Sequence, residues 1–275
     1  MKNIKINNFN ISNSNSFCLI AGPCVIESKD HTIKMAEFIY EICQELKINF
    51  IFKASFDKAN RTSAKSIRGV GLEQALDIFY EIKTLFHCPI ITDIHNEFQC
   101  NEIAKSDIID ILQIPAFLCR QTDLLIAAGK SQKIINVKKG QFLSPHDMVN
   151  VIDKILTTNN QKIMLTERGA SFGYNSLISD FRSIEIMKRT GYPVIFDATH
   201  SVQEPGALGS SSGGKREFVP VLSKAAVAVG VAGIFIETHN DPDNAPSDGS
   251  NMLNIKDLKT LLLKLKEFDC ISKAQ

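Results

Sequence analysis

Short apolar runs and longer amphipathic stretches alternate along most of the chain. The apolar runs occupy residues 17–21, 50–53, 89–92, 111–114, 133–137, 162–166, 193–196 and 233–236. Runs this short and continuously apolar predict strands of a sheet that is covered on both faces. The stretches that follow carry apolar residues at helical spacing and predict helices at 32–46, 72–86, 123–129, 145–156, 180–189, 219–229 and 255–268. Alternating strands and helices favour parallel strands joined by helical crossovers.

Eight predicted strands in 275 residues fit a closed (β/α)8 barrel of the α/β class, the TIM barrel, better than an open sheet. The chain shows no linker and no shift in composition, so we expect one domain over residues 1–275. Residues 1–16 are polar and rich in Asn and Ser. We expect this extension to form a short β-hairpin that closes the lower end of the barrel.

Composition excludes several classes of protein. The formal net charge of +1 provides no overall field that would attract nucleic acid or a membrane surface. We find no stretch with the length and hydrophobicity of a membrane span, and no apolar core of a signal peptide near the N-terminus, so we expect a cytoplasmic protein. The seven cysteines include no CxxC pair, which argues against a disulfide framework or a zinc-finger arrangement.

Polar side chains follow the predicted strands, where barrels of this fold place their active sites. These residues are Cys24, Glu27, Lys53, Lys58, Asp93, His95, Gln113, Lys138, Glu167, Arg168, Asp197, His200, Glu237 and His239. A barrel is stabilised by its packed interior, so a purely structural one would not need titratable groups at successive strand ends. The pattern therefore predicts an enzyme.

Cations are concentrated in this set. Residues 50–63 lead from an apolar run into Lys53, Lys58 and Arg61, and Lys138 and Arg168 follow other predicted strands. A single phosphate seldom needs more than two or three such partners, so the cluster predicts two phosphorylated substrates, or one phosphate and one carboxylate. Arg120 is a further candidate, for its own site or for that of a neighbouring subunit. The alternative for residues 50–63 is a solvated basic loop.

A second constellation combines a thiol, an imidazole and two carboxylates: Cys24, His200, Glu237 and Asp248. This mixture suits a divalent transition ion such as Zn, Fe or Mn better than Mg. The alternatives are a cysteine that packs as a small apolar residue and an aspartate that belongs to a turn.

The stretches that carry these residues resemble the family of 3-deoxy-D-manno-octulosonate 8-phosphate synthases (KDO8P synthases). They read IAGPCVIES, FKASFDKANRTS, ITDIHNEFQ, LQIPAFLCRQTDLL, NVKKGQF, LTERGASFGYNSLISDFRS, FDATHSVQEPG and FIETHNDPDNAPSDGSNML, and the likeness covers residues 17–253. The resemblance implies a transferase that condenses phosphoenolpyruvate with arabinose 5-phosphate and water and releases inorganic phosphate. It also implies a homotetramer and a step in lipopolysaccharide biosynthesis.

The resemblance assigns roles to individual residues. It implies a phosphoenolpyruvate site made of Lys53, Ser55, Lys58, Gln113, Lys138 and Arg168. It implies an arabinose 5-phosphate site made of Asn60, Arg61, Thr62, Asp93 and His95, with Arg120 supplied by an adjacent subunit. Lys58, Cys24, His200 and Asp248 are the expected catalytic residues.

The same resemblance separates two classes of the family. Metal-independent members carry Asn at the position of Cys24 and tend to carry a Cys-Asp-Gly sequence near the last loop. This chain has Cys24 and Ser247-Asp248-Gly249. It therefore resembles the metal-dependent class, with Cys24, His200, Glu237 and Asp248 as the expected ligands.

Two other functions are compatible with the residues. The related DAHP synthases, which use erythrose 4-phosphate, typically carry KPRTS where this chain has KANRTS, and sialic acid synthases also condense phosphoenolpyruvate. A barrel that binds phosphosugars without catalysis is the second alternative, and such a protein should lack the complete set of strand-end residues.

Overall fold

The computed structural model describes residues 1–59, 68–206 and 213–274. Within them, eight parallel strands form a closed ring: β3 (Cys18–Gly22), β4 (Phe50–Lys53), β5 (Ile90–Asp93), β6 (Ile111–Ile114), β7 (Ile134–Lys138), β8 (Ile163–Glu167), β11 (Val194–Asp197) and β14 (Gly233–His239). The ring closes because β11 pairs with both β8 and β14. The prediction of a (β/α)8 barrel is confirmed.

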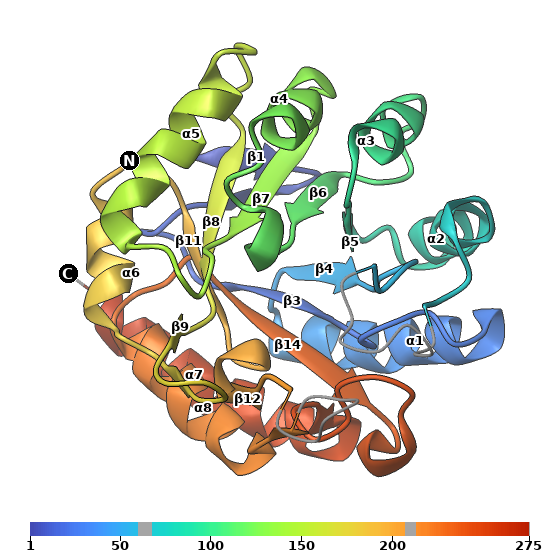
Figure 1. The fold of residues 1–275 in the computed structure, drawn as a ribbon. Helices are drawn as coiled ribbons and strands as arrows, with labels where there is room; N and C mark the ends of the chain where they lie inside the picture. The colour runs from blue at the N-terminus through green and yellow to red at the C-terminus, as the bar shows by residue number, and fades with distance from the viewer. Residues whose placement is uncertain (60–67, 207–212, 275) are drawn as a thin grey trace.

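Helices surround the ring of strands (Figure 1). They are α1 (Lys29–Leu46), α2 (Leu72–Phe86), α3 (Glu97–Ala104), α4 (Thr122–Lys130), α5 (Met148–Leu156), α6 (Arg182–Lys188), α7 (Val219–Ala228) and α8 (Ile255–Ser272). The sequence reading missed α3, a short helix that buries only Cys100 and Ile103 and so shows little helical periodicity. Among the described residues, no helix has the length and hydrophobicity needed to span a membrane.

Short elements complete the structure. Two-residue strands are β9 (Ala170–Ser171), β10 (Leu177–Ile178), β12 (Gln203–Glu204), β13 (Gly213–Gly214) and β15 (Leu253–Asn254), and single 3-10 turns lie at Ala116–Leu118, Pro145–Asp147, His200–Val202, Arg216–Phe218 and Pro242–Asn244. The antiparallel pair β9–β10 lies in the loop between β8 and α6. The chain therefore elaborates the loops that follow the strands, where the predicted site lies.

Alternate residues of each strand point into the barrel. Near the amino ends of the strands the inward residues are apolar, as Ile51 and Ile91 are. Two positions further along the same strands the inward residues are Lys53 and Asp93, and both are buried. A second apolar cluster, which includes Phe52, packs between the strands and the helices. The barrel thus has an apolar lower half and a polar upper half.

An N-terminal hairpin closes the lower end of the barrel. Its strands are β1 (Ile4–Ile6) and β2 (Phe9–Ile11), with Ile4 opposite Ile11. Ile4, Ile6 and Ile11 are buried in the same cluster as the inward apolar residues of the barrel. Asn13 then ties the segment to β11, since its amide donates to Tyr192 O and accepts from Val194 N, each at 2.8 Å. The predicted hairpin is confirmed.

Gly22 links the packing of the barrel to the polar upper half. It lies opposite Glu237 in the β3–β14 pairing, and a Cβ at this position would be 1.9 Å from Lys53 O. Because that atom belongs to the main chain, Gly22→Ala must displace β4. We expect a loss of about 3 kcal/mol or more in the free energy of unfolding, measured by denaturant titration.

Gly71→Ala is the matched control. A Cβ there meets no atom within 4 Å, but the φ of 82° is left-handed. We expect this substitution to cost only about 1 kcal/mol. Equal losses for the two variants would contradict the proposed clash at Gly22.

Candidate functional site

A chain of buried hydrogen bonds crosses the polar upper half of the barrel. The Thr166 hydroxyl donates to Asn136 Oδ1 at 2.7 Å, and Asn136 Nδ2 donates to Gln113 Oε1 at 3.1 Å. Gln113 Nε2 and the Ser55 hydroxyl each donate to one carboxylate oxygen of Asp93. All five side chains belong to buried residues. The chain connects residues of five adjacent strands or strand ends and so fixes Ser55, Asp93 and Gln113 relative to one another.

A buried ion pair continues this chain toward β14. Lys53 Nζ lies 2.7 Å from Glu237 Oε1 and 3.0 Å from Ser55 Oγ. Lys58 Nζ lies 4.0 Å from the same Glu237 oxygen. Burial alone would raise the pKa of Glu237, but the charges of Lys53, His200 and Lys58 hold that pKa well below its usual range. The carboxylate therefore stays ionised.

Lys58 is a protonated group at neutral pH. Burial alone would lower its pKa, but the negative charges of Glu237, Asp93 and Asp248 help to raise that pKa above the usual lysine value. Its side chain is only 14% exposed. Lys58 can therefore present a proton and a positive charge to a molecule bound above the barrel.

A second group of cations lies across the barrel. Lys138 Nζ is 2.7 Å from Asp197 Oδ2 and 4.0 Å from the centre of the Phe235 ring. Arg168 Nη2 donates to Gln203 Oε1 at 2.9 Å. Arg168 Nη1 is buried, and no hydrogen-bond partner for it exists among the described residues. Burial lowers the pKa of Arg168, although nearby carboxylates oppose the change. A buried guanidinium with a free donor is a ready partner for an anion.

Potential metal ligands lie beside these cations. Ligand atoms of Cys24, Glu237 and Asp248 are all within 4.8 Å of one another, and Cys24 Sγ is 3.2 Å from Asp248 Oδ2. His200 Nε2 is 3.7 Å from Glu237 Oε2 and 4.0 Å from Asp248 Oδ2. Glu237 Oε2 is buried and has no hydrogen-bond partner in the described part of the chain. The unpartnered oxygen fits a cation bound between these side chains.

The hydrogen bond of His200 supports the same arrangement. His200 Nδ1 lies 2.9 Å from Asp197 Oδ2, and since the pKa of Asp197 is held low by His200 and Lys138 against the effect of burial, the carboxylate accepts this bond. In neutral His200 the proton is then on Nδ1, and Nε2 presents a lone pair toward Glu237 and Asp248. A carboxylate that orients a histidine in this way is typical of metal sites.

The thiol of Cys24 needs the charge of an ion to ionise. Burial, followed by the charge of Glu237, raises the pKa of Cys24 well above its usual value. A coordinated divalent ion favours the thiolate instead. Thiolate, imidazole and carboxylates together suit Zn, Fe or Mn. The residues present thus fit a divalent transition metal.

Glu27, His31 and His239 form a different cluster outside this site. His239 Nε2 lies 2.9 Å from Glu27 Oε1, and the Asp241 N–H donates to His239 Nδ1 at 2.9 Å. Because Nδ1 accepts a bond, neutral His239 carries its proton on Nε2 and donates it to Glu27. That nitrogen has no lone pair for a metal in this arrangement. Glu27 and His239 thus bind each other, and their expected place among the strand-end residues of the site stays a prediction.

Glu167 does not point into the upper interior of the barrel. It is the last residue of β8, and it points outward, where Oε2 accepts from Ser183 Oγ of α6 at 2.6 Å. Thr166 and Arg168, on either side of it, belong to the interior instead. The assignment of Glu167 to the site failed because side chains alternate along a strand and only one face of each strand meets the ligand space.

His95 lies at the edge of the upper interior. Its ring packs edge-on against Phe56, with ring centres 6.1 Å apart, and Nδ1 is buried without a hydrogen-bond partner in the described chain. Burial lowers the pKa of His95, so the ring is neutral at pH 7. The predicted residues Asn60, Arg61 and Thr62 lie outside the described residues.

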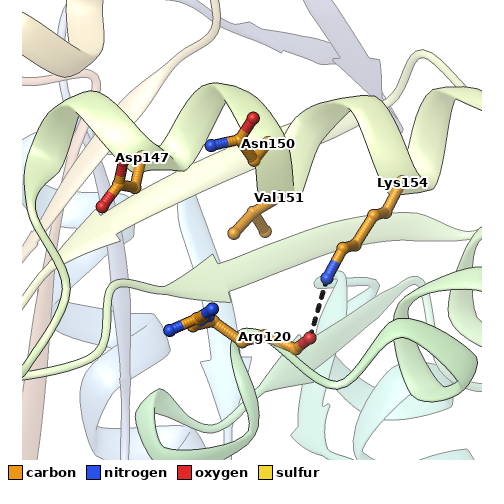
Figure 2. Close-up of a pocket in the computed structure, with 5 residues that line it drawn as sticks. All are labelled: Arg120, Asp147, Asn150, Val151 and Lys154. Carbon is orange, nitrogen blue, oxygen red and sulfur yellow. Dashed lines mark hydrogen bonds between the residues drawn. The ribbon is translucent and has the colours of Figure 1, made fainter.

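Arg120 lies apart from the other predicted residues. It lines a surface pocket of about 280 Å³ between the loop after β6 and α5, together with Asp147, Asn150, Val151 and Lys154 (Figure 2). Lys154 Nζ donates to Arg120 O at 2.9 Å, while the exposed guanidinium points away from Lys154. Within one chain, Arg120 therefore does not join the cation cluster of the barrel.

Sequence reasoning gave no role to several residues that organise the site. Asn136 and Thr166 are polar residues within apolar strand runs. Each stands two positions before a predicted site residue, Lys138 or Arg168, and so belongs to the same face of its strand; this spacing could have identified both from the sequence. Gln203 bridges Arg168 and Asp248, since its Nε2 donates to Asp248 Oδ1 at 3.3 Å. Gln203 follows a 3-10 turn in a loop, and no periodic signal marks it.

Comparison with known proteins agrees with this architecture. Residues 3–274 match the model of the DAHP synthetase I family. The chain is 60% identical over 270 residues to a 2-dehydro-3-deoxyphosphooctonate aldolase of Bartonella henselae, an alignment that covers 98% of this chain and 96% of the relative. It is 57% identical over 272 residues to a protein of the same name from Rickettsia prowazekii, covering 99% and 98% of the two chains. The chain therefore belongs to the DAHP synthetase I family.

Proposed function

We propose that the protein is a 3-deoxy-D-manno-octulosonate 8-phosphate synthase. It condenses phosphoenolpyruvate with D-arabinose 5-phosphate and water, releases inorganic phosphate, and serves lipopolysaccharide biosynthesis in the cytoplasm. The relatives carry a name for the same octulosonate phosphate chemistry. The observation that carries the proposal is the buried Nη1 of Arg168, for which the described residues provide no hydrogen-bond partner, because it offers a place for an anionic substrate inside the barrel.

Phosphoenolpyruvate is assigned to the interior cations. Its carboxylate and phosphate need several positive partners, and the proposed ligands are Lys53, Ser55, Lys58, Gln113, Lys138 and Arg168. Lys53 is paired with Glu237, and Lys138 is paired with Asp197. The substrate must therefore compete with these carboxylates, while Arg168 Nη1 has no partner to lose among residues 1–59, 68–206 and 213–274.

Arabinose 5-phosphate is assigned to the rim above these residues. Asp93 and His95 form one part of the proposed subsite, and Asn60, Arg61 and Thr62 form another. Arg120 is exposed and lies apart from its own barrel interior. We therefore assign its guanidinium to the sugar phosphate of an adjacent subunit within a homotetramer.

A divalent metal is assigned to Cys24, His200, Glu237 and Asp248, which places the protein in the metal-dependent class of the family. Zn, Fe and Mn each suit this donor set. When bound, the ion would supply Lewis-acid chemistry that orients the aldehyde or the attacking water. Asp197 holds His200 in the tautomer that such a ligand needs.

The proposed reaction begins when C3 of phosphoenolpyruvate attacks the aldehyde carbon of open-chain arabinose 5-phosphate. The aldehyde oxygen gains the electron pair and takes a proton from Lys58, which is protonated at neutral pH. Water adds at C2, and its proton goes to the side of the site where His200 and Asp248 lie. The C2–O bond to phosphate then breaks, and the C2 hydroxyl gives its proton to the departing phosphate, which leaves the keto group and inorganic phosphate. The interior cations hold the two substrates in reach of each other.

Phosphate release from phosphoenolpyruvate tests this function directly. With arabinose 5-phosphate we expect turnover, and with erythrose 4-phosphate we expect kcat/KM to be lower by at least about 100-fold, because polar groups for the longer sugar lose their partners. Higher activity with erythrose 4-phosphate would instead assign the chain to the DAHP synthases. Absence of release with any sugar phosphate would refute catalysis and leave a phosphosugar-binding barrel.

Chelation and substitution of Cys24 test the metal class. We expect a chelator to abolish activity of the unmodified protein and to have a much smaller effect on Cys24→Asn, because an amide does not provide the thiolate ligand. Metal content by mass spectrometry should fall in Cys24→Asn. Cys270→Asn changes an exposed cysteine of α8 and is the control. A Cys24→Asn protein that chelation still inactivates completely would contradict the assignment.

A further inference from the structure

A second buried ion pair lies directly behind two of the interior cations. Lys139 Nζ is 3.6 Å from Glu167 Oε2, and each side chain is only 2% exposed. Lys139 follows Lys138, the last residue of β7, and Glu167 precedes Arg168 at the end of β8. Since neighbouring residues of a strand face opposite sides, the pair lies outside the barrel while Lys138 and Arg168 point inside.

Lys139 holds the chain that leaves β7. Its N–H donates to Thr166 O of β8 at 2.8 Å. Its Nζ donates to Gly140 O at 3.2 Å and to Leu143 O at 3.3 Å. The side chain thus binds the first residues of the β7–α5 loop to the end of the barrel, immediately after Lys138.

Glu167 holds the chain that leaves β8. Its Oε1 accepts from the main-chain N–H groups of Arg168 at 3.0 Å and Gly169 at 2.7 Å. Gly169 has a φ of 93°, in the left-handed region, so the chain turns sharply directly after Arg168. The other carboxylate oxygen accepts from Ser183 of α6. Glu167 therefore sets the direction in which the main chain carries the Arg168 side chain.

The two loops are also bonded to each other. The N–H of Ser171, in the β8–α6 loop, donates to Gln141 O, in the β7–α5 loop, at 2.9 Å. With the Lys139–Glu167 pair between them, the loops form one hydrogen-bonded unit behind the anion site. A buried ion pair is poor at stabilising a fold compared with apolar residues of equal volume. The directional contacts of this pair with main-chain atoms point to a role in placing neighbouring groups.

We propose that Lys139 and Glu167 are positioning residues for the reaction. Neither side chain reaches the barrel interior, and both act through the main chain by fixing Lys138 and Arg168 relative to each other. This inference rests on the proposed function, in which Lys138 and Arg168 bind phosphoenolpyruvate. It predicts that loss of the pair weakens the binding of phosphoenolpyruvate even when the fold is intact.

Three variants test the proposal: Lys139→Met, Glu167→Gln and the double variant with both changes. Each single variant leaves a buried charge without its partner, so we expect both to melt at lower temperature than the unmodified protein. The double variant has no unpaired charge, and we expect it to recover most of the melting temperature. In all three, we expect KM for phosphoenolpyruvate to rise by about tenfold or more while KM for the sugar phosphate changes little.

Lys83→Met is the matched control. Lys83 of α2 makes the same kinds of contact, with Asp107 O at 2.6 Å, Ile108 O at 3.2 Å and the Asp110 carboxylate at 2.7 Å. The residues that Lys83 contacts immediately precede β6 in the chain. They therefore lie at the amino ends of the strands, at the opposite end of the barrel from Lys139 and Glu167. We expect this variant to lose stability without any change in KM for phosphoenolpyruvate.

The double variant decides the outcome. If its KM for phosphoenolpyruvate returns to normal together with its melting temperature, the pair is merely structural and the proposal is wrong. Titration calorimetry with phosphoenolpyruvate provides a second measurement that does not depend on turnover. If the unmodified protein binds phosphoenolpyruvate but turns over no sugar phosphate, the proposed function fails, while the effect of the pair on binding is still measured.

Discussion

The ion pair between Lys53 and Glu237 is the interaction on which the upper half of the barrel depends. Both side chains are almost completely buried, and the charged atoms are 2.7 Å apart. An unpaired charge in such a place would be very costly, so each cation of the interior needs an acid within reach. Lys138 and Asp197 satisfy the same requirement. The interior can therefore hold a dense set of charges, and the atoms that find no partner within the described part of the chain mark where ligands fit.

Two residues connect the proposed anion side of the site with the proposed metal side. Asp197 Oδ2 accepts from Lys138 at 2.7 Å and lies 2.9 Å from His200 Nδ1. Gln203 lies between Arg168 and Asp248 and bonds to both. A ligand that displaces one partner changes the hydrogen bonding of the other. We therefore expect substitutions on the two sides of the site to be non-additive.

The barrel was predictable from the sequence because its signal is periodic and repeated. Strand β4, helix α2 and the order of the elements follow from apolar spacing alone. The positions of Asp93, Lys138 and Arg168 at the upper end of the barrel were predictable, because each residue stands at the end of an apolar run. The outward direction of Glu167 could not be predicted because it depends on strand register. The bridging role of Gln203 could not be predicted because it depends on loop conformation. The separate location of Arg120 likewise depends on how a loop packs against α5.

The central claim is that one polar interior binds an anion at Lys138 and Arg168 and a metal at Cys24, His200, Glu237 and Asp248. Diffraction from crystals grown with phosphoenolpyruvate and Mn²⁺ tests it most directly, because anomalous scattering locates the ion. The account predicts an anomalous peak among those four ligands and an anionic group of phosphoenolpyruvate against Arg168 Nη1. An ion bound instead at Glu27, His31 and His239, or phosphoenolpyruvate bound away from Arg168, would contradict it.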